Sequence, residues 1–541
     1  MALGMLLLFG AQAPEGKVHT KVTTALIAVS VVVTTKAQGQ TSSKNVYSVL
    51  SQSSVFNQRV YNSSGQSIGT LNQAVPNVYA FGGNLSLGAV GATLPISSFQ
   101  VNASIIQVNN AINSSIATAL SAIPLASPAS GVIFRTDPLT GADLPATSTL
   151  GPVFTERAET IGKHRWYLGI SHEDFHFTSL NGQSLNGLTI LYPGGTLSGI
   201  TNLAGGQKLT SYPATFQVGM DVRLSQNIAF ITYGVTDRID VSVGLPLVHS
   251  AVGARTFNGI LYDGDGLAGQ TGALTANPNC WCAGTFNPGA YVIGNNAANF
   301  TQPQIGQSSL GKTGFGDLLL RAKGTVLSRR NIAIALGADL RLPTGDEANY
   351  LGTGATSVKP FVAVSLYTKR LARNIIFAPH FTAGWQFNGK SILGGQLQPT
   401  TLTASMSDGS GTVSYAGAPI GASKGYLPDI FSWAVGSEVA IGHHNTVIVD
   451  ILGNQIGWVH GAPNLIEGTA TGFSPTTLQG VTARGLMGGP GTISFGQYNG
   501  AFGYKARLIG NLVFTFNALV RFDNNSLTSR FSPLYGLGYS F

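Results

Sequence analysis

The chain has 541 residues, of which 43% are hydrophobic and only 10% are charged, and its formal net charge is +8. Soluble globular domains usually carry about 25% charged residues, so most of this surface is not expected to face bulk water in the ordinary way. The positive charge is spread along the chain without a basic run that alternates with aromatic residues, so nucleic acid is not an expected partner. Few charges, 70 glycines and many aromatic residues are typical of a membrane β-barrel. A large secreted β-protein is the alternative.

Residues 1–37 have the layout of a secretory signal peptide. Lys17 and Lys21 precede the apolar run Val22–Val33, and Ala37 is a small residue at a position suited to cleavage. The run is about half as long as a helix that crosses a bilayer, so a helical membrane protein fits poorly. The sequence therefore predicts export and removal of this region.

Residues 38–160 form a segment rich in Ser, Asn, Gln and Ala and nearly free of acidic residues. Within it apolar residues recur at roughly helical spacing before Pro124, which predicts a helix over about residues 100–125. We interpret this helix as periplasmic, with a plug or gate that enters a lumen as the alternative. The apolar residues are Ile105, Ile106, Val108, Ile112, Ile116, Leu120 and Ile123.

From residue 161 to residue 541, apolar and polar residues alternate in segment after segment. In the range 239–247, for example, Ile239, Val241 and Val243 alternate with Asp240 and Ser242. Alternation with a period of two places the two sets on opposite faces of a strand. We expect the apolar faces to touch lipid and the mixed polar faces to line a lumen. The same pattern occurs at 216–224, 317–323, 332–342 and 375–387.

The connections between these segments alternate between short and long, as in outer-membrane barrels. If residues 214–235 are two strands, the count is thirteen and long loops fall on both sides of the membrane. If they are one strand that projects beyond the bilayer, bulged near Ser225, the count is about 12 and both termini are periplasmic. The sequence thus predicts an all-β, transmembrane, antiparallel up-and-down barrel of about 12 strands, with a partly helical N-terminal segment. The expected extracellular loops are 179–212, 249–313, 344–356, 388–426, 456–494 and 523–529.

Cys280 and Cys282 lie in a Gly/Asn/Pro-rich stretch of one expected outer loop. A Cys-Trp-Cys pair can close a strained disulfide or contribute to a metal site, but no histidine or further cysteine lies nearby. No metal site and no cofactor are predicted. The near absence of cysteine agrees with export through the periplasm.

The last strand ends on an aromatic residue at the C-terminus. Tyr535, Leu537, Tyr539 and Phe541 share one face. This ending resembles the signal that the barrel-assembly machinery recognises in outer-membrane proteins. The expected partners are therefore this machinery, outer-membrane lipids and a small-molecule solute.

Ionisable residues that the strand register turns inward are the candidate functional residues. They either pair across the lumen and stiffen the barrel, or form a charged constriction that selects solutes by size and sign. Asp429 and Asp450 also face inward by register. The lumen and constriction candidates are Asp317, Arg321, Lys323, Asp339, Arg341, Lys359, His380, Glu438, Lys505, Arg507 and Arg521.

Three stretches resemble an outer-membrane transporter family named for the meta-pathway of phenol degradation. They are LGPVFTERAETIGKHRW at 150–166, YGVTDRIDVSVGLP at 233–246 and RLPTGD at 341–346. The resemblance runs from about residue 150 to the end and implies a barrel that takes up aromatic or other hydrophobic compounds. It transfers no catalytic residue.

The function predicted is a diffusion channel for small, aromatic or hydrophobic solutes in the bacterial outer membrane. An adhesion or structural barrel with binding loops is the first alternative. An outer-membrane lipid hydrolase is the second, but it needs a Ser or Cys nucleophile beside a histidine. His380 is expected to face the lumen, whereas a lipid-hydrolysing site should face the bilayer. No enzymatic activity is therefore predicted.

Overall fold

The chain divides into two units, residues 1–43 and 44–541, and every residue described below belongs to the second. The predicted signal region 1–37, Cys280 and Cys282 lie outside the described residues. In this computed structural model the described residues are 59–61, 67–70, 98–124, 134–136, 143–145, 149–192, 214–261, 291–293, 306–367, 375–405, 412–442, 444–457, 464–473, 480–489 and 494–541.

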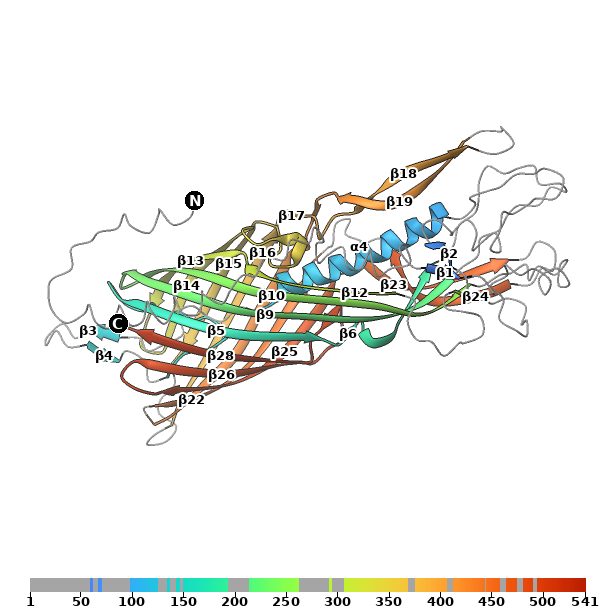
Figure 1. Ribbon diagram of the computed structural model, residues 1–541. Helices are drawn as coiled ribbons and strands as arrows, with labels where there is room; N and C mark the ends of the chain where they lie inside the picture. Colours follow the sequence, from blue (N-terminus) through green and yellow to red (C-terminus); the bar gives the residue numbers. More distant parts are fainter. Residues whose placement is uncertain are drawn as a thin grey trace, which may run out of the picture. The chain divides into compact units, whose positions relative to one another are not determined.

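The spanning strands form one closed antiparallel barrel (Figure 1). Each pairs with the next along the chain and the last pairs with the first, so the barrel has no open edge. Backbone hydrogen bonds between Trp166 and Phe541, at N···O distances of 2.9 and 3.0 Å, extend the seam. The prediction of 12 strands is confirmed. The strands are β5 (Trp166–Phe177), β9 (Ala214–Thr236), β10 (Ile239–Leu261), β13 (Leu318–Ser328), β14 (Ile332–Leu342), β15 (Ser357–Leu366), β16 (Ile375–Asn388), β21 (Ile430–Ile441), β22 (Asn445–Ile456), β25 (Phe495–Arg507), β26 (Leu512–Arg521) and β28 (Phe531–Ser540).

Short turns, such as residues 237–238, join the strands at one end of the barrel, which we call the inner end. The longer connections lie at the opposite, outer end. Two short hairpins, β1 (Arg59–Tyr61) with β2 (Ser67–Thr70) and β3 (Phe134–Thr136) with β4 (Asp143–Pro145), precede the barrel in sequence. The outer connections contain β6 (Ser179–Leu180), β7 (Gln183–Ser184), η2 (Leu185–Gly187), β8 (Leu188–Tyr192), β11 (Tyr291–Ile293), β12 (Gly306–Phe315), η3 (Glu347–Asn349), β17 (Lys390–Ser391), β18 (Leu397–Ser405), β19 (Thr412–Ala422), β20 (Gly425–Tyr426), β23 (Asn464–Phe473), β24 (Gly480–Gly489) and β27 (Leu527–Thr528).

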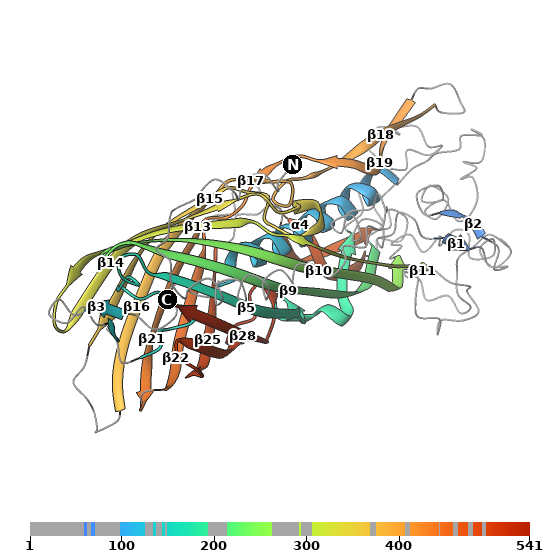
Figure 2. The same cartoon turned by 60° about the vertical axis from the view of Figure 1, so that its left-hand side comes forward.

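The long strand predicted over residues 214–235 exists as β9, which lies beside β10 in both views (Figure 2). The bulge expected near Ser225 is absent, because Ser225 pairs in register with His249. The prediction that a loop begins at residue 249 is wrong, since β10 continues to Leu261 and pairs with β12. Alternation persists there: Val248 and Val252 are buried, while His249 is exposed.

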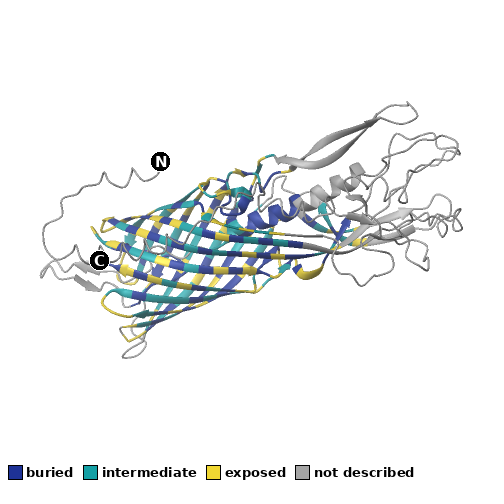
Figure 3. Ribbon diagram, viewed as in Figure 1, coloured by how far each residue is buried: buried dark blue, intermediate teal, exposed yellow. Residues whose placement is uncertain are grey.

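The outer surface of the barrel is apolar. Exposed and buried residues alternate along the strands (Figure 3). Aromatic side chains gather toward both ends of this surface: Trp166, Tyr539 and Phe541 lie at the inner end, and Trp385 and Phe387 lie toward the outer end. An apolar wall between two aromatic girdles, on a closed barrel of hydrogen-bonded strands, is the form that spans a bilayer. The protein is therefore an outer-membrane barrel.

The outer part of β9 corrects the expectation that apolar faces touch lipid. Met220, Val222 and Leu224 are 5%, 3% and 4% exposed and point inward, whereas the side chains of Asp221 and Arg223 are 55% and 59% exposed. The period of two is as predicted, but the direction of the apolar face is reversed. We attribute the reversal to position along the strand: this part extends toward the outer loops, where the outside is wet and a helix fills the inside.

That helix is α4 (Ser98–Ala122), whose side chains are described from Asn110 onward. Its apolar residues, Ile112 and Ile116 among them, belong to the same core cluster as Met220 and Val222. The C-terminal half of α4 therefore packs against inward-facing residues at the outer end of the barrel. Among the described residues, no helix combines the length and the apolar character that a bilayer crossing requires.

Buried polar residues on α4 satisfy their own hydrogen bonds. Ser115, Thr118 and Ser121 donate to the carbonyl oxygens four residues earlier, at 2.8, 2.8 and 2.9 Å. The hydroxyl of Tyr350 donates to Asn113 at 2.6 Å from the connection between β14 and β15. A helix with many Ser and Asn residues can thus be buried without unpaired polar groups.

Candidate lumenal site

Residues 149–161, which we call the inner segment, lie against the inward faces of the barrel strands. Nearly all of them are buried, although none belongs to a helix or strand. Because they form no ladder, their buried backbone groups need other hydrogen-bond partners, among them side chains. The backbone nitrogens of Gly151 and Ile161 donate to Glu438 and Asp240, each at 2.9 Å, from opposite parts of the segment. Strands β10 and β21 are thus linked through the lumen.

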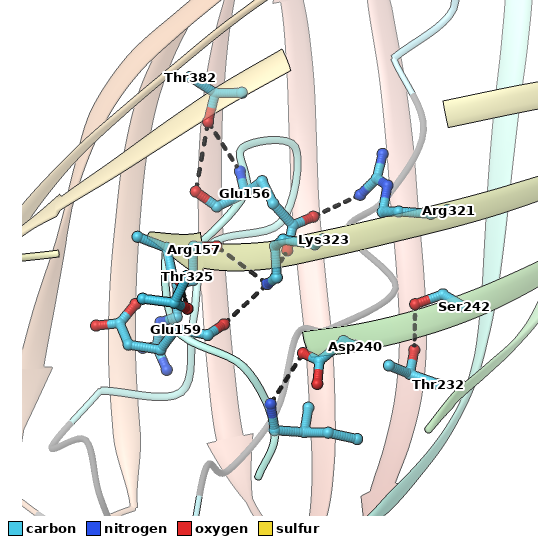
Figure 4. Close-up of polar contacts among 12 residues, drawn as sticks. Glu156, Arg157, Glu159, Thr232, Asp240, Ser242, Arg321, Lys323, Thr325 and Thr382 are labelled. Atoms are coloured by element: carbon cyan, nitrogen blue, oxygen red, sulfur yellow. Dashed lines mark hydrogen bonds and ion pairs between the residues drawn. The ribbon is translucent and has the colours of Figure 1, made fainter. Parts of the chain in front are cut away.

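Glu156 is the centre of one ionic cluster (Figure 4). Its carboxylate accepts hydrogen bonds from Arg321 and from Lys323, the latter at 2.9 Å. The Lys323 ammonium also donates to the carbonyl oxygens of Arg157 and Glu159, at 3.0 and 2.8 Å. Two candidate residues on β13 therefore hold the inner segment by charge-assisted hydrogen bonds.

Arg157 is the centre of a second cluster on the opposite side of the segment. Its guanidinium donates to Glu438 at 2.8 Å, and the two side chains are 4% and 3% exposed. His380 lies beside them, with Nε2 2.8 Å from Asp450 and Nδ1 3.7 Å from Glu438. Buried charges persist in proteins when they are paired and hydrogen-bonded, and the Arg157–Glu438 pair meets that condition. Through His380 and Asp450 the cluster extends across β16, β21 and β22.

Lys505 on β25 completes the hold on the inner segment. It is fully buried and donates to the carbonyl oxygens of Pro152 at 2.7 Å and Leu150 at 3.4 Å. Pro152 has no N–H group, so its carbonyl oxygen is its only backbone hydrogen-bonding group, and Lys505 binds that oxygen.

A cross-strand row of charges lies on β13, β14 and β15. Arg321 pairs in register with Asp339, and Asp339 with Lys359. Arg321 donates to both oxygens of Asp339, at 2.6 and 2.8 Å, and its guanidinium lies 5.1 Å from the ring centre of Phe361. Arg341 follows two residues after Asp339 on the same inward face. Four of the sequence-derived candidates are thus brought together.

Three candidates are placed elsewhere. Asp317 accepts hydrogen bonds from the backbone and hydroxyl of Thr353, both at 2.7 Å, and so holds the connection between β14 and β15. Arg521 pairs with Asp523 at 2.8 Å near the outer end. Arg507 lies next to the inner turn, where its backbone nitrogen donates to His444 at 2.8 Å. None of the three joins the clusters around the inner segment.

A cavity of about 110 Å³ separates the inner segment from the C-terminal end of α4. Ser121–Pro124 line it on one side and Phe154–Glu156 on the other. Part of its wall is apolar and part is charged or polar. The barrel residues that line it include Leu319, Arg321, Asp339, Arg341, Lys359, Phe361, Thr382, Gln386, Ile430, Leu452, Asn454 and Asn499.

Glu156, Arg157 and Glu159 were not among the sequence-derived candidates. They fall in the stretch 150–166, which was used only for its family resemblance. A usable signal existed, because three charges within four residues are unusual in a chain with only 10% charged residues. Asp240, which binds Ile161, was assigned to an inward face but given no role.

No group of three or more His, Cys, Asp or Glu residues suited to a metal ion occurs within the described ranges. No family model matches the chain, so membership of the phenol meta-pathway family stays a prediction. No curated protein matches it either.

Solved outer-membrane proteins resemble the structure at low identity. An outer-membrane channel from Pseudomonas putida F1 is 11% identical, with a TM-score of 0.35 over 71% of this chain and 98% of that one. The toluene transporter TbuX of Ralstonia pickettii is 11% identical (TM-score 0.26; 70% and 90% covered), and the monoaromatic hydrocarbon channel CymD is 10% identical (0.28; 70% and 88%). Such scores carry no inference about function, so we take function from the lumen itself.

Proposed function

We propose that the protein is a gated outer-membrane channel for small solutes with an aromatic or other apolar part. The observation that supports this most is the cavity inside the lumen, bounded on two sides by chain segments that are not part of the barrel wall. A barrel of 12 strands is wider than the barrels of about eight strands whose interior side chains alone can fill, and here the two segments occupy the lumen and leave this cavity between them.

The two segments that close the lumen differ in how they are held. The described part of α4 packs largely through apolar contacts in the outer half. The inner segment adds ionic and hydrogen bonds, those of Glu156 and Arg157 among them, to the apolar contacts of residues such as Val153. No described contact between the inner segment and the strands is covalent. We propose that the inner segment acts as the gate, because exchange of hydrogen-bond partners can release it without unfolding the barrel.

The composition of the cavity wall supports the solute class. Phe154, Leu319, Phe361, Ile430 and Leu452 offer apolar surface within the lumen. Pockets for small molecules are typically apolar with a few placed polar groups. A sugar-selective pore is expected to present a more uniformly polar wall.

Liposome swelling tests the proposal directly. Proteoliposomes with the full chain are expected to admit phenol faster than protein-free liposomes, and to admit a sugar of similar mass much more slowly. Folding is checked first by the heat-dependent shift of the barrel on a denaturing gel. A folded protein that speeds neither solute refutes the channel; binding of its outer loops to cells or matrix would then favour the adhesin alternative.

A further inference from the structure

The cavity wall contains more positive charge than its own carboxylates neutralise. Three cations line it, Arg321, Arg341 and Lys359, against two anions, Glu156 and Asp339. Both anions are bound by Arg321, and Glu156 is also bound by Lys323. The carboxylates are thus already engaged.

Arg341 and Lys359 are the cations left over. Neither makes a hydrogen bond or an ion pair with any residue in the described part of the chain. Asp317 and Asp339 act on Arg341, and Asp339 acts on Lys359, only at longer range. Both are half-buried and lie on adjacent strands, with Lys359 opposite Asp339 and Arg341 opposite Ser357. Charged groups removed from water without a partner are costly, so an anion between these two side chains lowers the free energy of the site.

The rest of the wall defines the other end of the ligand. Phe154, Phe361 and Leu452 offer apolar surface, and the volume of about 110 Å³ is smaller than, but of the same order as, the ~150 Å³ cavity that accepts benzene in another protein. A neutral hydrocarbon would leave the two cations unpaired. An inorganic anion would leave the apolar surface uncovered.

We propose that this cavity binds a small aromatic carboxylate, with its carboxylate between Arg341 and Lys359 and its ring against Phe154 and Phe361. The inference rests on the proposed function and names a solute class for it. A planar guanidinium suits a carboxylate because it can donate two parallel hydrogen bonds.

Calorimetric titration of the full chain in detergent tests the site with three probes. Benzoate is expected to bind saturably. Benzyl alcohol, which keeps the ring without the charge, and acetate, which keeps the charge without the ring, are each expected to bind at least about tenfold more weakly. Equal affinity for benzoate and either partial probe overturns the proposal.

Variants locate the binding. Arg341→Gln and Lys359→Gln are each expected to weaken benzoate binding about tenfold or more. Lys359→Arg keeps the charge, so its affinity for benzoate is expected to stay within a few-fold of the wild-type value. Lys390→Gln, at an exposed position on β17 outside the cavity wall, is the matched control and should leave binding unchanged. Benzoate affinity unaffected by both cavity variants refutes the site.

Swelling assays on the same preparations separate the two proposals. Phenol permeation without benzoate binding refutes the carboxylate site and leaves the channel intact. Benzoate binding without permeation of any solute supports the site and refutes the channel.

Discussion

Glu156→Gln tests whether ionic contacts keep the inner segment in the lumen. The substitution preserves the shape of the side chain and removes only its charge. In the structure Glu156 accepts hydrogen bonds from Arg321 and Lys323, and all three side chains are at most 13% exposed. The variant is expected to release the inner segment more often and to raise permeation.

The size of the effect depends on which hydrogen bonds Arg321 and Lys323 retain in the variant. Two hydrogen bonds to a charged group are worth about 1.5–3 kcal/mol each, which sets an upper limit of about 3–6 kcal/mol. Arg321 retains both oxygens of Asp339, and Lys323 retains two carbonyl oxygens of the inner segment. We therefore expect a net loss of about 2–3 kcal/mol, or about 30- to 150-fold in the equilibrium between docked and released segment.

Single-channel recording in planar bilayers measures this shift as the fraction of time that the channel is open. Glu467→Gln is the control, because Glu467 on β23 accepts a hydrogen bond from Gln183 at 3.3 Å and makes no described hydrogen bond or ion pair with the inner segment. An unchanged open fraction in a correctly folded Glu156→Gln barrel would show that these contacts do not hold the gate.

Three further perturbations probe stability and assembly. Glu438→Gln leaves the buried Arg157 without its carboxylate and should lower the free energy of unfolding by about 3–5 kcal/mol, measured as a lower urea midpoint of unfolding in detergent. Adding Arg157→Leu should recover part of that loss. If the effects of the two substitutions simply add, the ion pair is not the cause. Gly234→Ala places a Cβ 1.8 Å from the carbonyl oxygen of Gly162 and should lower the unfolding temperature through about 1–3 kcal/mol of overpacking; an unchanged temperature contradicts that contact. Deletion of Phe541 should reduce the heat-shifted, assembled form in outer membranes several-fold, whereas wild-type amounts would remove this residue from the assembly signal.

Local pattern alone was enough for the architecture. Alternation with a period of two identifies strands wherever one face is apolar, and the contrast between short turns and long connections sets their number and direction. For this reason the single strand over 214–235 and the inward direction of Arg321, His380 and Lys505 followed from the sequence. Aromatic residues at the strand ends, such as Trp385, marked the outer surface in the same way.

Tertiary structure decided which side chains contact each other and which face of each strand is exposed to water. Arg157 and Glu438 are separated by 281 positions along the chain, and no local period relates them. The apolar face of Met220 and Val222 turns inward because α4 lies inside the barrel at that height. Alternation with a period of two does not reveal what lies on either face of a strand. Periodicity reports the backbone geometry of one strand, whereas contacts and burial depend on distant segments that only the closed barrel brings together.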